Sequence, residues 1–255
     1  MKKISEIYDY LCELAPLNLQ MDFDNSGFQI GRPERAANKV LLALDVTDEV
    51  VSEAASMGAE LIISHHPLIF RGVKSINGNY PDGERLLKLA ESGIAVISMH
   101  TNLDIAEDGV NDVLIRSLGA EPIGPLDEYG CGRIGKLEND LVLSEFLVIC
   151  REKLNANGLR YFDAGRHVLK IAVMGGSGGD SIEDAYKHGC DTYVTSDIKY
   201  HQFQRAEELG INLIDADHFC TENPIIPILR DKLSKKFPDI EFVVSRKHRA
   251  IISFA

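Results

Sequence analysis

The segment that decides the fold is KVLLALDVTDEVVSEAASMGAELIISHHPL, residues 39–68. An apolar run at 39–44 is followed by a helical pattern at 48–59, and a second apolar run leads directly into His65 and His66. A strand, a helix and a strand in this order are typical of a parallel βαβ unit. A helical pattern at 84–93 and a strand pattern at 94–99 continue the alternation. We therefore expect a largely parallel α/β sheet that binds ligands at the carboxyl ends of its strands.

The second half of the chain repeats this pattern. Residues 170–201 align without a gap with the segment that starts at Lys39, so that Gly58 meets Gly189 and the two histidines meet Ser196 and Asp197. GINLIDADHFCTE (210–222) then aligns with GIAVISMHTNLD (93–104). An internal duplication predicts two related α/β domains, 1–126 and 127–255, which join in the Pro- and Gly-rich stretch 121–132. The alternative is that two unrelated βαβ units resemble each other by chance.

The composition restricts the class of protein. The 255 residues carry a formal net charge of −12, which disfavours nucleic acid as a partner. No apolar run approaches the length of a membrane span, and the N-terminal segment MKKISEIYDYLCELAPL has the pattern of an amphipathic helix instead of a secretory signal. The five cysteines lack CxxC spacing. We therefore expect a reduced, cytoplasmic protein without a thiolate zinc site.

Histidines and carboxylates concentrate at the expected strand ends. Asp104 follows His100 by four residues, and Glu222 follows His218 by four residues, which places the latter pair on one helical face if a helix begins there. Imidazoles combined with carboxylates suit a divalent transition metal such as Zn, Mn, Fe, Co or Ni. Histidines that are only hydrogen-bonded in the core or in turns are the alternative. The histidines at strand ends are His65, His66, His100, His201 and His218.

Three imidazoles and two carboxylates exceed what one ion needs, whereas two ions about 3.5–4 Å apart would use them all.

Two other segments face the same edge. The loop GGSGG (175–179) offers backbone N–H groups that could hold a phosphate, although a plain turn between strand and helix is the simpler interpretation. The segment SDIKYH (196–201) places Lys199 where it could bind an anion, with a solvated strand end and a helix cap as the alternative.

The motifs SHHPLIF, MHTNLD, SDIKYH, DADHFCTEN, DNSGFQIG and ALDVT together resemble the family of GTP cyclohydrolase 1 type 2 homologs, also called NIF-three-like dinuclear metal-centre proteins. The resemblance runs from about residue 5 to the end of the chain. It implies two related α/β domains with a pair of metal ions in the cleft between them, and a ring-shaped homohexamer. The family's metal ligands fall on His65, His66, Asp104, His218 and Glu222. Asp217 and Ser196 stand where the family usually has glycine, and Asp217 could orient an imidazole from behind.

Two functions are consistent with these residues. The first is a metal-dependent hydrolase, of cyclohydrolase or phosphoesterase type, that acts on a nucleotide-like or cyclic amide small molecule. His100 or His201 would then move a proton and Lys199 would hold an anionic group. The second is a non-catalytic scaffold that binds or delivers metal ions, because no nucleophile or base arrangement is evident beyond the ligands. The sequence identifies neither the substrate nor the metal.

Overall fold

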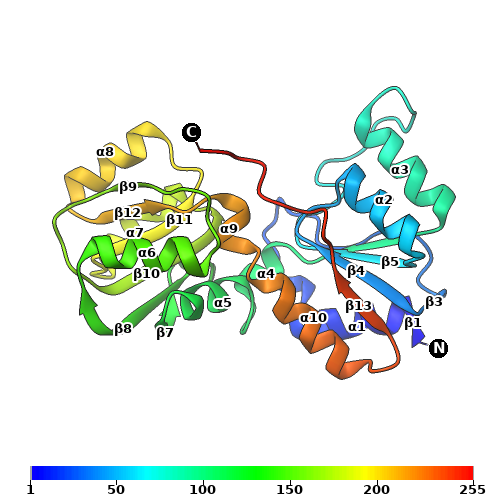
Figure 1. The fold of residues 1–255 in the computed structure, drawn as a ribbon, viewed down its shortest axis with the longest axis horizontal. Coiled ribbons are helices and arrows are strands. Elements are labelled where there is room, and N and C mark those ends of the chain that lie inside the picture. Colours follow the sequence, from blue (N-terminus) through cyan, green and yellow to red (C-terminus); the bar gives the residue numbers. More distant parts are fainter. Residues whose placement is uncertain (1, 255) are drawn as a thin grey trace. The chain divides into compact units, whose positions relative to one another are not determined.

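A computed structural model describes residues 2–254, which form two compact units. The first unit comprises residues 2–106 and Ile226–Arg249, and the second comprises Glu107–Ile225 with residues 250–254. Each unit contains one main sheet with helices packed against it (Figure 1). The chain is therefore a mixed α/β protein with two main sheets, as the sequence predicts. The domain boundary expected near residue 126 lies inside the second unit, in the connection between two antiparallel strands.

The sheet of the first unit has the strand order β13-β4-β5-β6-β2. β13, β4, β5 and β6 run parallel, and β2 pairs antiparallel with β6. The residues of β4, β5 and β6 are apolar almost throughout because a parallel sheet is buried on both faces. The strands are β2 (Gly27–Ile30), β4 (Lys39–Ala43), β5 (Leu61–Ser64), β6 (Ala95–Ser98) and β13 (Glu241–Val244), and a separate pair joins β1 (Lys2–Lys3) to β3 (Ala36–Ala37).

Helices cover both faces of this sheet. In Figure 1, α2 and α3 lie on one side of the strands, and α1 and α10 lie on the other. Helix α2 starts where the Thr47 hydroxyl accepts the Val50 N–H, and it ends at Gly58 in the left-handed conformation. The predicted amphipathic helix at the N-terminus is α1. The helices are α1 (Ile4–Leu14), α2 (Asp48–Met57), α3 (Pro81–Ser92), α4 (Thr101–Ile105) and α10 (Ile225–Lys236), with a 3₁₀ turn at Leu17–Leu19.

The second unit has the strand order β7-β8-β10-β11-β12-β9. Its centre consists of three parallel strands, β10, β11 and β12. β8 and β7 extend the sheet antiparallel beyond β10, and β9 pairs antiparallel with β12. The strands are β7 (Ala120–Pro125), β8 (Arg133–Leu141), β9 (Arg160–Phe162), β10 (Val168–Ser177), β11 (Thr192–Ser196) and β12 (Asn212–Asp215).

Alternation along the strands divides the core of the second unit into two layers. Ile171 and Val173 of β10 pack with the helices α5 and α6, whereas Ala172 and Met174 pack with α7 and α8 on the opposite face. The helices are α5 (Val110–Ser117), α6 (Leu143–Lys153), α7 (Ile182–Lys187), α8 (Tyr200–Leu209) and α9 (His218–Glu222), with a 3₁₀ turn at Gly179–Ser181. Among residues 2–254, no helix combines the length and the hydropathy that a membrane crossing requires.

Candidate metal centre

His65 and His66 leave the end of β5 side by side. The strand ends at Ser64, and the backbone N–H groups of both histidines donate to the same carbonyl, that of Leu44, at 3.2 and 2.9 Å. Consecutive side chains in a strand point to opposite faces, but this turn lies beyond the strand, and the two imidazole centroids are 5.1 Å apart. The end of β5 therefore presents two neighbouring imidazoles together.

His65 is buried, with 1% of its surface exposed. Its Nδ1 lies 2.8 Å from the carbonyl oxygen of Met99, which can only accept a hydrogen bond. Nδ1 therefore carries the proton in the neutral ring, and Nε2 presents a lone pair. That Nε2 lies 3.6 Å from a carboxylate oxygen of Asp104, so that two electron-pair donors face each other. A cation between them, or a second proton on the imidazole, balances this arrangement.

The imidazoles of His66 and His100 are also held through Nδ1, but by carboxylates in place of a backbone carbonyl. Nδ1 of His66 lies 2.7 Å from Asp45, and Nδ1 of His100 lies 2.7 Å from Asp24. A carboxylate on one ring nitrogen orients the ring and leaves the other nitrogen for a metal, which is the usual environment of histidine ligands. One ring nitrogen from each of His65, His66 and His100 lies within 4.8 Å of the others.

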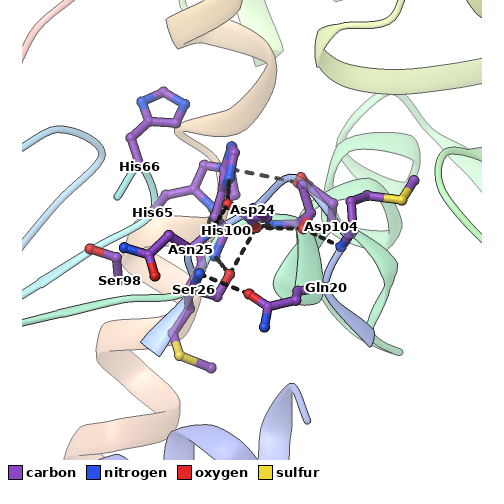
Figure 2. A network of polar contacts seen from close by, with 12 residues as sticks. Gln20, Asp24, Asn25, Ser26, His65, His66, Ser98, His100 and Asp104 are labelled. Atoms are coloured by element: carbon purple, nitrogen blue, oxygen red, sulfur yellow. Dashed lines mark hydrogen bonds and ion pairs between the residues drawn. The ribbon is translucent and has the colours of Figure 1, made fainter. Parts of the chain in front are cut away.

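Asp24 is the centre of the polar network that supports these rings. Besides His100, its carboxylate accepts hydrogen bonds from the Thr101 N–H and hydroxyl and from the Ser26 hydroxyl. Burial raises the pKa of Asp24, but the hydrogen bonds from His100 and Thr101 outweigh burial and hold that pKa well below its usual range. Figure 2 shows His65, His100 and Asp104 close together, with Asp24 and Ser26 beside them. Asp104 enters from α4, the short helix that begins directly after His100.

The second unit brings His218 and Glu222 together on α9. A helix begins at His218, which is the condition under which the four-residue spacing places His218 and Glu222 on one face, and Nε2 of His218 lies 3.2 Å from a carboxylate oxygen of Glu222. Nδ1 of His218 lies 2.8 Å from Asp197, which follows β11. Glu222 is 3% exposed. As at His65, where the acceptor is the Met99 carbonyl, an oxygen atom at Nδ1 leaves the Nε2 lone pair facing a carboxylate. At His218 that oxygen belongs to Asp197, and the carboxylate that Nε2 faces is Glu222.

The loop GGSGG packs against this pair. Gly176 has φ +67°, and a Cβ at this position would lie 2.2 Å from Glu222 Oε1. The backbone N–H groups of Gly175, Gly176 and Gly178 donate to the side chains of Asn111, Thr221 and Thr195. The hydroxyl of Ser196 donates to the carbonyl of Gly176. Ser196, which stands where the family usually has glycine, therefore supports the loop through its side chain. Because three of the five N–H groups of the loop are engaged within the chain, its contacts favour the simpler interpretation, a turn that supports the site, over a phosphate cradle.

Asp217 precedes His218 in a backbone conformation that favours glycine, with φ 70° and ψ 137°. Its carboxylate accepts the Cys220 N–H and so caps α9. Asp197, and not Asp217, orients the His218 ring. Between the two ligand candidates on α9, burial and the nearby Asp217 raise the pKa of Cys220 to about 12, which keeps its thiol protonated.

Not all predicted residues join these groups. His201 and Lys199 are exposed at the start of α8, and the groups of candidate metal ligands among residues 2–254 do not include His201. The sequence patterns do not predict the contacts of Asp24, Asp45 and Asp197 with the imidazoles, although Asp197 lies in SDIKYH, a segment expected at this edge of the sheet. Asp24 and Asp45 lie in the motifs DNSGFQIG and ALDVT, and this was the signal available.

Fold and site together define a two-sheet α/β protein with clusters of histidine and carboxylate that could hold metal ions. The chain belongs to the Duf34/NIF3 (NGG1p interacting factor 3) family, whose model matches residues 2–250. A Clostridium perfringens protein named GTP cyclohydrolase 1 type 2 homolog is 36% identical over 99% of both chains. The family predicted from the motifs is confirmed.

Solved structures agree with this assignment. Staphylococcus aureus protein SA1388 matches with a TM-score of 0.93 and 29% identity over 100% of this chain and 99% of that one. HcgD from Methanocaldococcus jannaschii, in its reduced form, matches with a TM-score of 0.85 and 30% identity over 95% of this chain and 97% of that one.

Proposed function

We propose that this chain is a dinuclear metal protein in which His65, His66, Asp104, His218 and Glu222 hold two divalent transition-metal ions. One observation carries the proposal. Nδ1 of each of the three imidazoles contacts a carbonyl or carboxylate oxygen, at Met99, Asp45 or Asp197, and Nε2 remains the coordinating atom. Imidazole and carboxylate donors suit Zn, Fe, Mn, Co or Ni.

We further propose that both units contribute ligands to the same pair of ions, in the cleft between two domains. The support is the donor count: one unit supplies two ligand imidazoles and a carboxylate, and the other supplies one imidazole and a carboxylate. Metal content per chain tests this. Glu222→Ala should reduce two ions to fewer than one, while Glu207→Ala on the exposed face of α8 should retain two. If Glu222→Ala and His65→Ala each retain one full ion per chain, each unit binds its own ion. The proposal that the two units share a pair of ions would then be wrong.

The matching strand registers support descent from an internal duplication. Val40 of β4 pairs with Leu61 of β5, and the residues 131 positions later, Ile171 and Thr192, pair with each other. The helix-ending glycines Gly58 and Gly189 correspond in the same alignment, and both have positive φ. In each unit an antiparallel edge strand pairs with the last of these parallel strands, β2 with β6 and β9 with β12, so that this one edge corresponds as well.

The activity that we propose is hydrolysis of a nucleotide-like or cyclic amide substrate. The bound ions would activate water by lowering its pKa. The chain itself supplies the imidazole of His100, which the Asp24 carboxylate orients through Nδ1 and which therefore has Nε2 available to take or give a proton. Exposed Lys199 is the candidate for contacting an anionic part of the substrate, and exposed His201 is the second candidate for moving the proton. The relatives' name, GTP cyclohydrolase 1 type 2 homolog, supports a nucleotide as the first substrate class to test.

The test is turnover by metal-loaded protein of nucleotides, cyclic amides and phosphoesters, compared with the double variant His65→Ala/His66→Ala. We expect activity that depends on both histidines. No turnover above this control on any of the three classes, together with rapid exchange of the bound metal, would instead support a metal-delivering scaffold.

A further inference from the structure

Two phenylalanine rings of the first unit remain exposed beside the histidine cluster, which consists of His65, His66 and His100. Phe23 is 67% exposed and Phe70 is 44% exposed. The two rings meet edge to face with centroids 6.4 Å apart, and the Phe70 ring meets His100 in the same manner at 5.9 Å. Aromatic surface that stays in solvent next to a polar site is characteristic of ligand-binding regions.

The backbone that carries these rings is held in place. The N–H of Ile69 donates to the Gln29 side chain at 3.1 Å, and the carbonyl of Ile69 accepts from the Asn25 side chain at 2.6 Å. These two hydrogen bonds fix the residue before Phe70 to the segment that contains Phe23. Phe23 in turn directly precedes Asp24, which the hydrogen bonds from His100 and Thr101 anchor. The rings are therefore positioned before any ligand arrives, which lowers the entropy cost of binding.

We propose that Phe70, with Phe23 beside it, binds the planar aromatic ring of the substrate and thereby determines specificity. The inference rests on the proposed function for the role of the neighbouring cluster. An exposed phenylalanine face gains by contact with another aromatic ring, either offset-stacked or edge-on. The 5.9 Å between the Phe70 and His100 centroids places a ring bound on Phe70 next to the histidine cluster. A substrate with a nitrogen heterocycle fits this arrangement better than a ring-free phosphoester.

The test compares two probes that differ in the base alone. Guanosine 5′-monophosphate and ribose 5-phosphate share the sugar and the phosphate, and calorimetric titration of metal-loaded protein gives the affinity for each. We expect the purine nucleotide to bind more tightly by about 5–150-fold, the range for contact of one base with an aromatic side chain.

Matched variants assign that difference to the ring. Phe70→Leu keeps an apolar side chain and removes the aromatic face, whereas Phe70→Tyr keeps the face. We expect Phe70→Leu to remove most of the preference for the purine nucleotide, and Phe70→Tyr to retain it, with metal content and affinity for ribose 5-phosphate unchanged in both. Phe23→Leu should have a smaller effect in the same direction, and Tyr129→Ala, at an exposed aromatic of the second unit, should have none.

The outcomes separate this inference from the proposed function. If base-dependent binding is lost in Phe70→Leu while no substrate is turned over, the ring site stands and the hydrolase assignment fails. If the protein turns over ring-free phosphoesters and binds both probes equally, the hydrolase stands and the ring site is wrong. A change in oligomer mass in Phe70→Leu without a change in the affinity ratio would assign the two rings to a contact between copies, which also overturns the proposal.

Discussion

Asp45 lies 2.7 Å from Nδ1 of His66, and this contact determines which ring nitrogen of His66 faces the candidate centre. Asp24 and Asp197 have the same role for His100 and His218. Such carboxylates fix the ring orientation and make the other nitrogen a stronger donor. The residues that contact the histidines from behind should therefore influence metal affinity nearly as much as the ligands do.

Asp45→Ala should lower metal affinity by about 10–100-fold without altering the fold, because the His66 ring loses both its orientation and its negative partner. Competition with a chelating dye measures the affinity. The matched control is Asp48→Ala, three residues along, where the carboxylate pairs with Arg85 at the surface. Equal affinity in the wild type and Asp45→Ala would show that the contact has no role in metal binding.

His248 makes the stability of the first unit depend on pH. Its Nδ1 accepts the Leu44 N–H at 3.1 Å, which requires a neutral ring. Burial lowers its pKa, although Asp45 and Glu53 act in the opposite direction. Between the unfolded pKa of about 6.5 and the lower folded pKa, the unfolded chain binds a proton that the folded chain does not. The free energy of unfolding contributed by this group is therefore complete above about pH 6.5 and is lost as the pH falls through that window.

Urea unfolding of metal-free protein at several pH values measures this effect. The wild type should lose more stability between neutral pH and mildly acidic pH than His248→Gln does, since glutamine can accept the same N–H without titrating. Parallel pH profiles for the two proteins would contradict the assignment.

At the level of elements, the loop after β10 supports the ligands on α9. Gly176→Ala should impair both stability and metal binding, because the new Cβ would overlap with Glu222 and the backbone already has a positive φ. The matched control is Gly189→Ala, which also has a positive φ but no neighbouring atom within 4 Å of the added Cβ. The control should cost about 1–2 kcal/mol of stability and leave metal content unchanged. Equal metal content in the two variants would contradict the supporting role of the loop.

Local sequence patterns predicted the elements around the site well. The parallel strands with their helices, and the position of His65 and His66 at the end of a strand, follow from short-range periodicity. The carboxylates that contact the imidazoles cannot be predicted from such local patterns. Asp24 and His100 are 76 residues apart, and His66 and Asp45 are 21 residues apart, so only the folded chain brings them together. The cap formed by Asp217 was likewise hidden, since an aspartate at a position that favours glycine has no distinctive local pattern.

At the level of the whole molecule, the family resemblance leads us to propose a ring-shaped homohexamer. Native mass spectrometry of metal-loaded protein should give a mass six times that of the 28.2 kDa chain. Light scattering after size-exclusion chromatography provides an independent measurement at higher concentration. A monomer or dimer in both measurements would contradict the proposal.

The organisation of the chain into units was the part least accessible to sequence reading. A boundary at the Pro- and Gly-rich stretch near residue 126 follows from composition, but the contacts in the structure divide the chain after Ala106 and return Ile226–Arg249 to the first unit. That return depends on the pairing of β13 with β4, about two hundred positions apart, as in Glu241 with Lys39. Pairing over such distances depends on the whole fold and leaves no local signature.

This return has a consequence for biosynthesis. The ribosome completes every strand of the second sheet before it produces β13, so the half of the protein that is made first is finished last. Until then β4 has an open, strongly apolar edge, which is a surface that promotes association between nascent chains. The Leu44 N–H likewise has to wait for His248, which is synthesised after every strand of the second sheet. Chains truncated before β13 should therefore fail to complete the fold of the first unit, whose other strands lie far from β13 in sequence.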